Sequence, residues 1–402
     1  MNADEYMWLL GHNGAGRKHA GGNQAPSLLE LDAAVENRLA LRGPLLLKRA
    51  WPKRPGHTAL EYIDANGKLA PGQWFADREA CLQVATSTRR GAGEFGQIAV
   101  VGGGHILLQL SGADRKLIGL APVLARPHAT LVVHRPERRA VVRLEDGIET
   151  RYAKVVVPHR AAELAGQLAA LQLSVGGRLR IPLLRELDLE RGVVVMSALP
   201  GRPVHALLDE PCLPALLAAG GAALRVLHDS PVPDGTGSHS ARNEQAVVAH
   251  WLDRAGEFAP AALPALYAHR YYVSAPLTGE ATQPVLLHRD FYDKQIIAAG
   301  DGSVGLLDFD TLSTGEAALD LANALVHLEL RCIQRRWPAS HARRAASGLL
   351  GGYEPDSAIM RRLPAYADAT RLRLACVYTL RPQEASTVTA LLDLLGTPIG
   401  EL

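Results

Sequence analysis

Two short apolar runs between residues 285 and 323 each end at carboxylates. The first run, residues 285–287, predicts a strand that delivers Asp290 into a loop, and Gln295 follows five residues later. Residues 296–307 predict a β-hairpin, because two alternating apolar segments flank a Gly-Asp-Gly turn. The far end of this hairpin presents Asp308, so the turn brings the second carboxylate back toward the first.

A carboxylate, a side-chain amide and a second carboxylate in one place suit phosphoryl transfer. Asp290 can accept or orient the proton of an attacking hydroxyl. Gln295 and Asp308 offer the hard oxygen ligands that Mg²⁺ takes when it bridges the phosphates of ATP, and Asp310 is a candidate ligand for a second ion. The alternative is an ordinary hairpin with surface acids, and either half of the pattern alone would not separate the two interpretations.

The motifs in this stretch resemble those of a known protein family. His-Arg-Asp-Phe-Tyr-Asp-Lys-Gln and the later Asp-Phe-Asp are similar to the kinase motifs H-R-D-x-x-x-x-N and D-F-G, with Gln for Asn and Asp for Gly. The following Gly-Glu-Ala-Ala-Leu-Asp-Leu-Ala resembles the G-D-P-x-x-D-L-A stretch of the aminoglycoside phosphotransferase and choline kinase superfamily, and Asp320 falls on the buried structural Asp of that superfamily. The two departures are similar to those in bacterial maltokinases and glucosamine kinases.

The resemblance implies a fold and an activity. The fold would be α+β and bilobal, protein-kinase-like, with a small β-rich N-lobe, a large helical C-lobe and an additional small N-terminal α+β cap. The activity would be transfer of phosphate from ATP, with Mg²⁺, to a hydroxyl of a sugar, an amino sugar or an aminoglycoside-like molecule.

Composition limits the other partners. The chain has 402 residues, 48% apolar and 21% charged, with a net charge of +2, so charge gives no case for nucleic acid or a membrane as the main partner. Its four cysteines lie far apart without metal-ligand spacing, no apolar run approaches membrane-spanning length, and the first residues lack the pattern of a signal peptide. We expect a cytoplasmic protein, and the sequence leaves its oligomeric state open.

Pattern and composition divide the chain into four segments. We expect a flexible tail, a cap module with helices over 77–85 and 114–124, an N-lobe with its hinge, and a helical C-lobe with the catalytic and metal loops. Their ranges are 1–27, 28–128, 129–200 and 201–402.

Lys154 lies in the third predicted strand of the N-lobe, in Arg-Tyr-Ala-Lys-Val-Val-Val. Because the chain otherwise prefers Arg, a Lys at this place suggests a compact ammonium for the α and β phosphates. A Lys on the solvent face of a strand is the alternative. The helix predicted over 159–173 has one acid, Glu163, which is either the ion-pair partner of Lys154 or a solvated first-turn residue.

The turn over residues 135–139, Arg-Pro-Glu-Arg-Arg, departs from the resembled family, which places glycines over the phosphates. Arg135 and Arg138 would then replace backbone amides with bidentate side-chain contacts, unless the segment is only a rigid turn. The apolar strand over 193–196 and the Ser-Ala-Leu-Pro-Gly that follows resemble the lobe connection, or hinge, of this superfamily. The resemblance implies that adenine pairs with backbone groups of Ser197 to Leu199 and that Met196 borders its ring.

The sequence is also compatible with a second class of function. The missing glycines and the Gln also fit a non-catalytic nucleotide-binding scaffold. Transfer to a protein is less favoured, because no A-P-E segment follows Asp308.

Overall fold

The computed structural model describes residues 25–334 and 337–399. The tail expected over residues 1–27 lies outside them, except for 25–27. The first part of the chain forms an antiparallel six-stranded sheet in the order β1-β2-β3-β4-β6-β5. We call this the N-terminal sheet. Its elements are β1 (Leu28–Leu29), α2 (Ala33–Leu39), β2 (Leu45–Arg54), β3 (His57–Ile63), β4 (Leu69–Phe75), α3 (Arg78–Gly91), β5 (Gln97–Val101), a 3₁₀ turn (Gly102–Gly104) and β6 (Ile106–Leu110).

Local side chains explain two of its corners. Between β3 and β4, the Asp64 carboxylate accepts hydrogen bonds from the backbone N–H groups of Asn66 (2.9 Å) and Lys68 (2.7 Å), and Gly67 takes the positive φ that this turn needs. Helix α3 begins where Asp77 accepts from the N–H of Glu79.

The second sheet is antiparallel and five-stranded, in the order β10-β11-β9-β8-β7. Helix α5 covers one face through apolar residues such as Leu164, and α4 packs on the other through Leu120 and Val123. The elements are α4 (Leu120–Leu124), β7 (Thr130–Arg135), β8 (Arg139–Glu145), β9 (Thr150–Val156), α5 (Pro158–Val175), β10 (Leu184–Asp188) and β11 (Val193–Ser197).

The helix expected over 114–124 is therefore shorter than predicted. The Asp114 side chain accepts hydrogen bonds from the backbone N–H groups of Lys116 and Leu117, which holds a turn before α4 begins.

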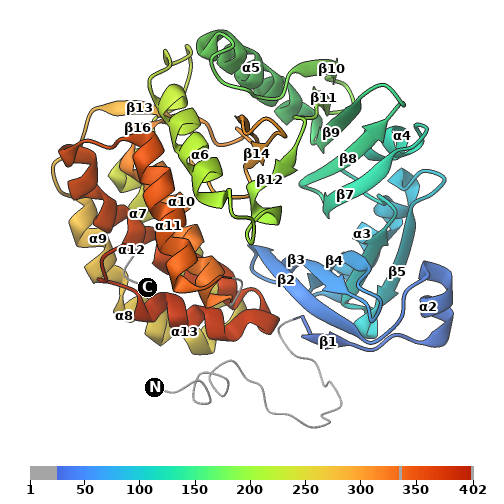
Figure 1. Cartoon of the computed structure of the whole chain (residues 1–402). Coiled ribbons are helices and arrows are strands. Elements are labelled where there is room, and N and C mark those ends of the chain that lie inside the picture. The colour runs from blue at the N-terminus through green and yellow to red at the C-terminus, as the bar shows by residue number, and fades with distance from the viewer. Residues whose placement is uncertain (1–24, 335–336, 400–402) are drawn as a thin grey trace.

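The remaining chain is mostly helical and forms the largest core. This part contains two small antiparallel sheets, β12-β14-β15 and β13-β16. In Figure 1, β12 and β14 lie on its side toward the five-stranded sheet, whereas β13 and β16 lie beyond α6. The elements are β12 (Arg202–Pro203), α6 (Leu213–His228), α7 (Ala241–Phe258), α8 (Leu263–Ala268), α9 (Arg270–Leu277), β13 (Pro284–Leu287), β14 (Ile296–Ala298), β15 (Val304–Leu306), β16 (Ser313–Glu316), α10 (Ala318–Ile333), α11 (Ala339–Tyr353), α12 (Ser357–Thr379) and α13 (Ala385–Asp393), with 3₁₀ turns at Val204–Ala206, Pro260–Ala262 and Pro382–Glu384.

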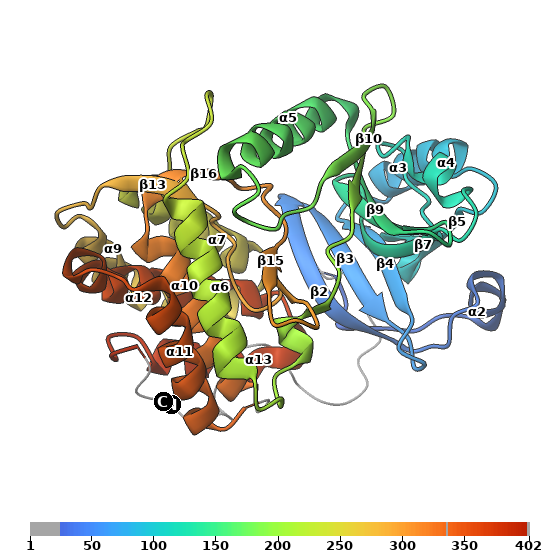
Figure 2. The same ribbon diagram turned by 45° about the horizontal axis from the view of Figure 1, so that its top comes forward.

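The N-terminal sheet joins the two other parts instead of standing apart. Ala50 of β2 donates a 2.8 Å hydrogen bond to the carbonyl of Leu380, and Leu380 belongs to the core of that sheet. Figures 1 and 2 show β2 and β3 lying between the five-stranded sheet and the C-terminal helices. None of the described helices is long and apolar enough to cross a membrane.

Candidate active site

The loop after β13 is held by one buried carboxylate. Asp320, at the start of α10, accepts hydrogen bonds from the backbone N–H groups of His288 (2.7 Å) and Arg289 (2.6 Å). Burial by itself would raise the pKa of Asp320, but the His228 imidazole at 3.1 Å and these contacts hold the pKa below its usual value. Because Arg289 has a φ of 65°, this anchoring compensates for a backbone conformation that side chains disfavour, and the loop presents Asp290 in a fixed place.

The predicted hairpin is formed by β14 and β15, with Ile296 opposite Leu306. It brings Gln295 and Asp308 to the same end, and the Gln295 side-chain amide lies 3.5 Å from a carboxylate oxygen of Asp290. His288 Nε2 lies 2.8 Å from the carbonyl of Leu307 and donates to it, which ties the first loop to the hairpin. The three groups that suggested phosphoryl transfer therefore lie together.

Lys154 of β9 reaches both acids at the end of the hairpin. Its Nζ atom lies 2.9 Å from Asp308 Oδ1 and 2.6 Å from Asp310 Oδ1, and Arg139 lies 3.5 Å from the other oxygen of Asp310. Burial would raise the pKa of Asp308, but the charge and hydrogen bond of Lys154 outweigh burial, so this pKa is lowered. Asp308 is ionised at neutral pH and can ligate a metal.

Asp290 has the opposite electrostatic balance. Burial raises the pKa of its carboxyl, and the charge of Asp308 adds to this, while His288 and Arg373 only partly oppose it. A carboxylate with a raised pKa accepts a proton more readily than a solvated one.

Mg²⁺ fits this donor set. Asp308, Asp310 and Gln295 provide carboxylate and amide oxygens, the hard ligands that this ion prefers. Within the part of the chain that the structure describes, no group of three or more His, Cys, Asp or Glu side chains could hold a metal by itself. A metal here would depend on the amide and on oxygens from a bound phosphate.

These groups line a cleft of about 420 Å³ between the five-stranded sheet and the hairpin. The hinge residues Met196, Ser197 and Leu199 line its other end, where the sequence analysis expects adenine. This volume lies within the usual range for small-molecule sites.

The structure corrects the expected role of Glu163. Its side chain is 52% exposed and pairs with Arg160 at 3.1 Å, whereas Lys154 pairs with Asp308 and Asp310. The expected ion pair with Lys154 is wrong, because Glu163 lies on the solvent face of α5. One turn later, Gln167 lines the cleft, and its buried Oε1 atom has no hydrogen-bond partner among the residues that the structure describes. The helical spacing of Gln167 with Leu164 and Leu168 is the signal that could have found it.

The structure also corrects the predicted phosphate-binding role of Arg135 and Arg138 in the β7–β8 turn. Arg135 packs over the Trp51 ring at 4.9 Å and Arg138 is exposed, and neither lines the cleft. Arg139 does, because strand alternation places it on the same face of β8 as Val141, which pairs with Lys154. The alternation of side chains between the two faces of β8 is the sequence signal that could have identified Arg139.

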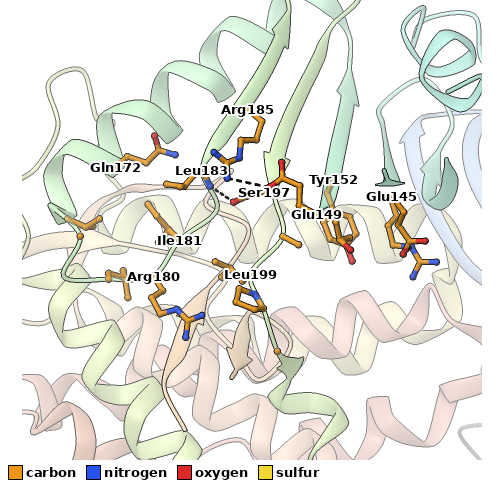
Figure 3. Close-up of a pocket in the computed structure, with 18 residues that line it drawn as sticks. Glu145, Glu149, Tyr152, Gln172, Arg180, Ile181, Leu183, Arg185, Ser197 and Leu199 are labelled. Carbon is orange, nitrogen blue, oxygen red and sulfur yellow. Dashed lines mark hydrogen bonds and ion pairs between the residues drawn. The ribbon is translucent and has the colours of Figure 1, made fainter. Parts of the chain in front are cut away.

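A larger hollow of about 760 Å³ lies behind the hinge, and Asp290, Asp308 and Asp310 are not among its lining residues. Figure 3 shows Glu149 paired with Arg185, and Ser197 accepting the backbone N–H of Leu183. In its wall, Arg143 also pairs with Glu145, and Arg180 donates a hydrogen bond to the Ser303 hydroxyl.

Comparison with known proteins agrees with this geometry. A family model described as the phosphotransferase enzyme family matches residues 128–365, more than half of the chain. The chain belongs to this family. It is therefore a phosphotransferase that uses an alcohol group as acceptor, and the predicted resemblance to the aminoglycoside phosphotransferase and choline kinase superfamily is confirmed.

Solved structures extend the likeness to the fold. Amicoumacin kinase hAmiN, in complex with AMP-PNP, Ca²⁺ and Ami, aligns with a TM-score of 0.53 at 16% identity, over 68% of this chain and 90% of that one. A choline/ethanolamine kinase family protein from Mesorhizobium loti aligns with a TM-score of 0.49 at 18% identity, over 70% of this chain and 93% of that one. No curated protein matches the sequence. The bilobal kinase-like fold of this family member is confirmed.

Proposed function

We propose that the protein transfers the γ-phosphate of ATP, with Mg²⁺, to a hydroxyl of a sugar, an amino sugar or an aminoglycoside-like molecule. One observation carries the proposal. Gln295, Asp308 and Lys154 come from separate loops and strands and line one cleft, and Asp290 lies next to it, with a carboxylate oxygen 3.5 Å from the Gln295 amide.

Each of these groups has a role in the proposed reaction. Asp308, Asp310 and Gln295 would hold Mg²⁺, which supplies positive charge to the phosphate oxygens. Lys154, whose ammonium group donates hydrogen bonds to both Asp308 and Asp310, would turn toward the α and β phosphates. Arg139 would place a second cation near the transferred group, taking the part that backbone amides play in a glycine-rich loop.

Asp290 would orient the acceptor hydroxyl and take its proton. Its raised pKa and its contact with Gln295 support this role, since the amide fixes the carboxylate beside the metal ligands.

A sugar is favoured as the acceptor by the Gln in place of Asn and by Asp-Phe-Asp, which resemble the motifs of maltokinases and glucosamine kinases. We further propose a cytoplasmic location, supported by four free cysteines and by the need for ATP.

The decisive experiment pairs the parent protein with Asp290→Asn. ATP consumption is screened against free sugars, amino sugars and aminoglycosides, and phosphorylated product is identified by mass spectrometry. We expect product from the parent with at least one acceptor, and a loss of roughly 10²–10⁴-fold in the variant. ATP binding without product from any acceptor would favour a non-catalytic scaffold, and equal turnover in both proteins would remove Asp290 from the mechanism.

A further inference from the structure

A third cavity, of about 360 Å³, lies where the N-terminal sheet meets the β7–β8 turn and helix α7. We call it the junction pocket. Residues 51–53 of β2 form one wall, residues 135–138 of the turn form another, and His250 and Arg254 of α7 complete it. It contains none of the residues that line the nucleotide cleft.

The junction pocket is strongly basic. Its cationic lining side chains are Lys53, Lys116, Arg135, Arg138 and Arg254, against a single acid, Glu137. Arg254 already pairs with Glu257 of its own helix at 2.9 Å. The net positive charge of the junction pocket therefore depends on how many of the other cations Glu137 neutralises.

The Glu137 carboxylate already forms ion pairs with three cations. Its carboxylate lies 2.6 Å from Arg115, 3.0 Å from Lys116 and 3.6 Å from Lys53, and only 4% of its side chain is exposed. Burial would raise the pKa of Glu137, but the hydrogen bond of Arg115 and the charge of Lys53 bring the pKa down to about 2. These contacts clamp the turn onto the N-terminal sheet, and Lys53 also donates to the carbonyl of Pro136 at 2.9 Å.

Arg135 and Arg138 are left without an anion. Among residues 25–334 and 337–399, no carboxylate forms an ion pair with either. Arg135 packs on Trp51, and burial together with the charges of Arg139, Arg49 and Arg138 lowers its pKa to about 10. Arg135 is partly buried against the Trp51 ring and Arg138 is exposed, and since neither has an ion pair among the described residues, the two guanidinium groups are suited to an anion.

We propose that the junction pocket binds a small molecule that carries a phosphate group, with Arg135 and Arg138 as its ligands. Guanidinium groups match phosphate oxygens in bidentate geometry, and the cavity has room for a small organic moiety beyond the phosphate. The phosphate can belong to the acceptor itself or to a separate effector. Either ligand would act on the turn that ends at Arg139, which lies 3.5 Å from Asp310.

Binding is tested with inorganic phosphate and glucose 6-phosphate as probes, by calorimetry at saturating Mg²⁺ and AMP-PNP so that the nucleotide cleft is filled. We expect the parent to bind both, and Arg135→Gln and Arg138→Gln to weaken binding about tenfold or more, since each removes a charge-assisted contact. Arg143→Gln is the matched control: it removes a cation from β8 that is 43% exposed and contacts Glu145. Its affinity should stay within about twofold of the parent.

Three results would overturn the proposal: no binding by the parent, full displacement of the probe by AMP-PNP, or equal weakening in Arg143→Gln. Thermal melts distinguish lost binding from lost folding. Because Arg135 has no ion pair to lose, Arg135→Gln should melt within a few degrees of the parent. Arg135→Lys, which keeps the charge, should retain part of the affinity.

Kinetics with the best acceptor then identify the source of the phosphate. Inhibition by free phosphate that is competitive with the acceptor would mark the junction pocket as an acceptor subsite. A change in kcat without competition would mark an effector site. The calorimetry needs no turnover, so failure of the proposed kinase function and failure of this site are separate results.

Discussion

The ammonium of Lys154 lies 2.6 Å from Asp310, so a cation of the protein already occupies the carboxylates that would bind the metal. The same atom lies 2.9 Å from Asp308. Without nucleotide, a divalent ion must compete with Lys154, whereas the phosphates of ATP offer the ammonium other partners. Nucleotide and metal should therefore bind together more tightly than either binds alone.

Lys154→Met tests this relationship. Removing the ammonium leaves two neighbouring carboxylates unneutralised, so Mn²⁺ should bind more tightly in the absence of nucleotide. The KM for ATP should rise roughly tenfold or more, because a charge-assisted phosphate contact is lost. Electron paramagnetic resonance of free Mn²⁺ measures the first effect and steady-state kinetics the second. Weaker Mn²⁺ binding in the variant would contradict the competition.

Asp308→Ala should remove Mg²⁺-dependent nucleotide binding and turnover, because it deletes the carboxylate between Lys154 and Gln295. Asp301→Ala is the control, since Asp301 is an exposed acid in the turn of the same hairpin. Calorimetry of ATP with and without Mg²⁺ distinguishes the two. Unchanged turnover of Asp308→Ala at matched Mg²⁺ would exclude it as a ligand.

Gln295→Asn keeps the carboxamide but shortens its reach by one methylene, so part of the activity should survive. Gln295→Leu fills a similar volume without a ligand oxygen and should lose most of it. The Mg²⁺ concentration for half-maximal rate is the informative measurement, since it should rise in the Asn variant. If the Leu variant matches the parent, Gln295 is not a ligand.

Arg139→Gln should raise the KM for ATP or lower kcat by roughly tenfold or more, because Arg139 faces Asp310 in the cleft. The same change at Arg143, further along β8, should alter both constants by less than about twofold. Equal effects at the two positions would indicate that only the general charge of this strand matters.

Asp290→Asn should stabilise the protein at neutral pH while it reduces turnover. The folded-state pKa of Asp290 is raised above its usual value of 3.8, so folding disfavours its ionised form. This penalty is present above that folded pKa and disappears as the pH falls below 3.8. Denaturant unfolding at pH 7 should show the variant equal to or more stable than the parent, with the difference vanishing near pH 3. In the parent, kcat should fall on the acid side with an apparent pKa above 3.8. A variant that is less stable at pH 7 would argue against a buried, ionised Asp290.

Residue spacing and a short apolar pattern already define the centre of the site. A short loop separates Asp290 from Gln295, and a strand, a turn and a strand separate Gln295 from Asp308. Two apolar segments that flank a Gly-Asp-Gly turn are enough to predict the hairpin. Short-range pattern was enough to bring them together. Lys154 could also be placed, because its strand pairs with its sequence neighbour β8.

Which neighbouring charges reach that centre depends on how distant elements pack. Glu163 and Gln167 differ by one helical turn, and the packing of α5 determines which of them faces Lys154. Arg135 and Arg139 flank the same turn, yet Trp51 from a distant strand holds the first outside the cleft. The clamp on Glu137 comes from Lys53 and Arg115, whose contacts with it depend on how the N-terminal sheet docks. Local periodicity contains no information about such docking, because buried ion pairs form only after separate elements have packed.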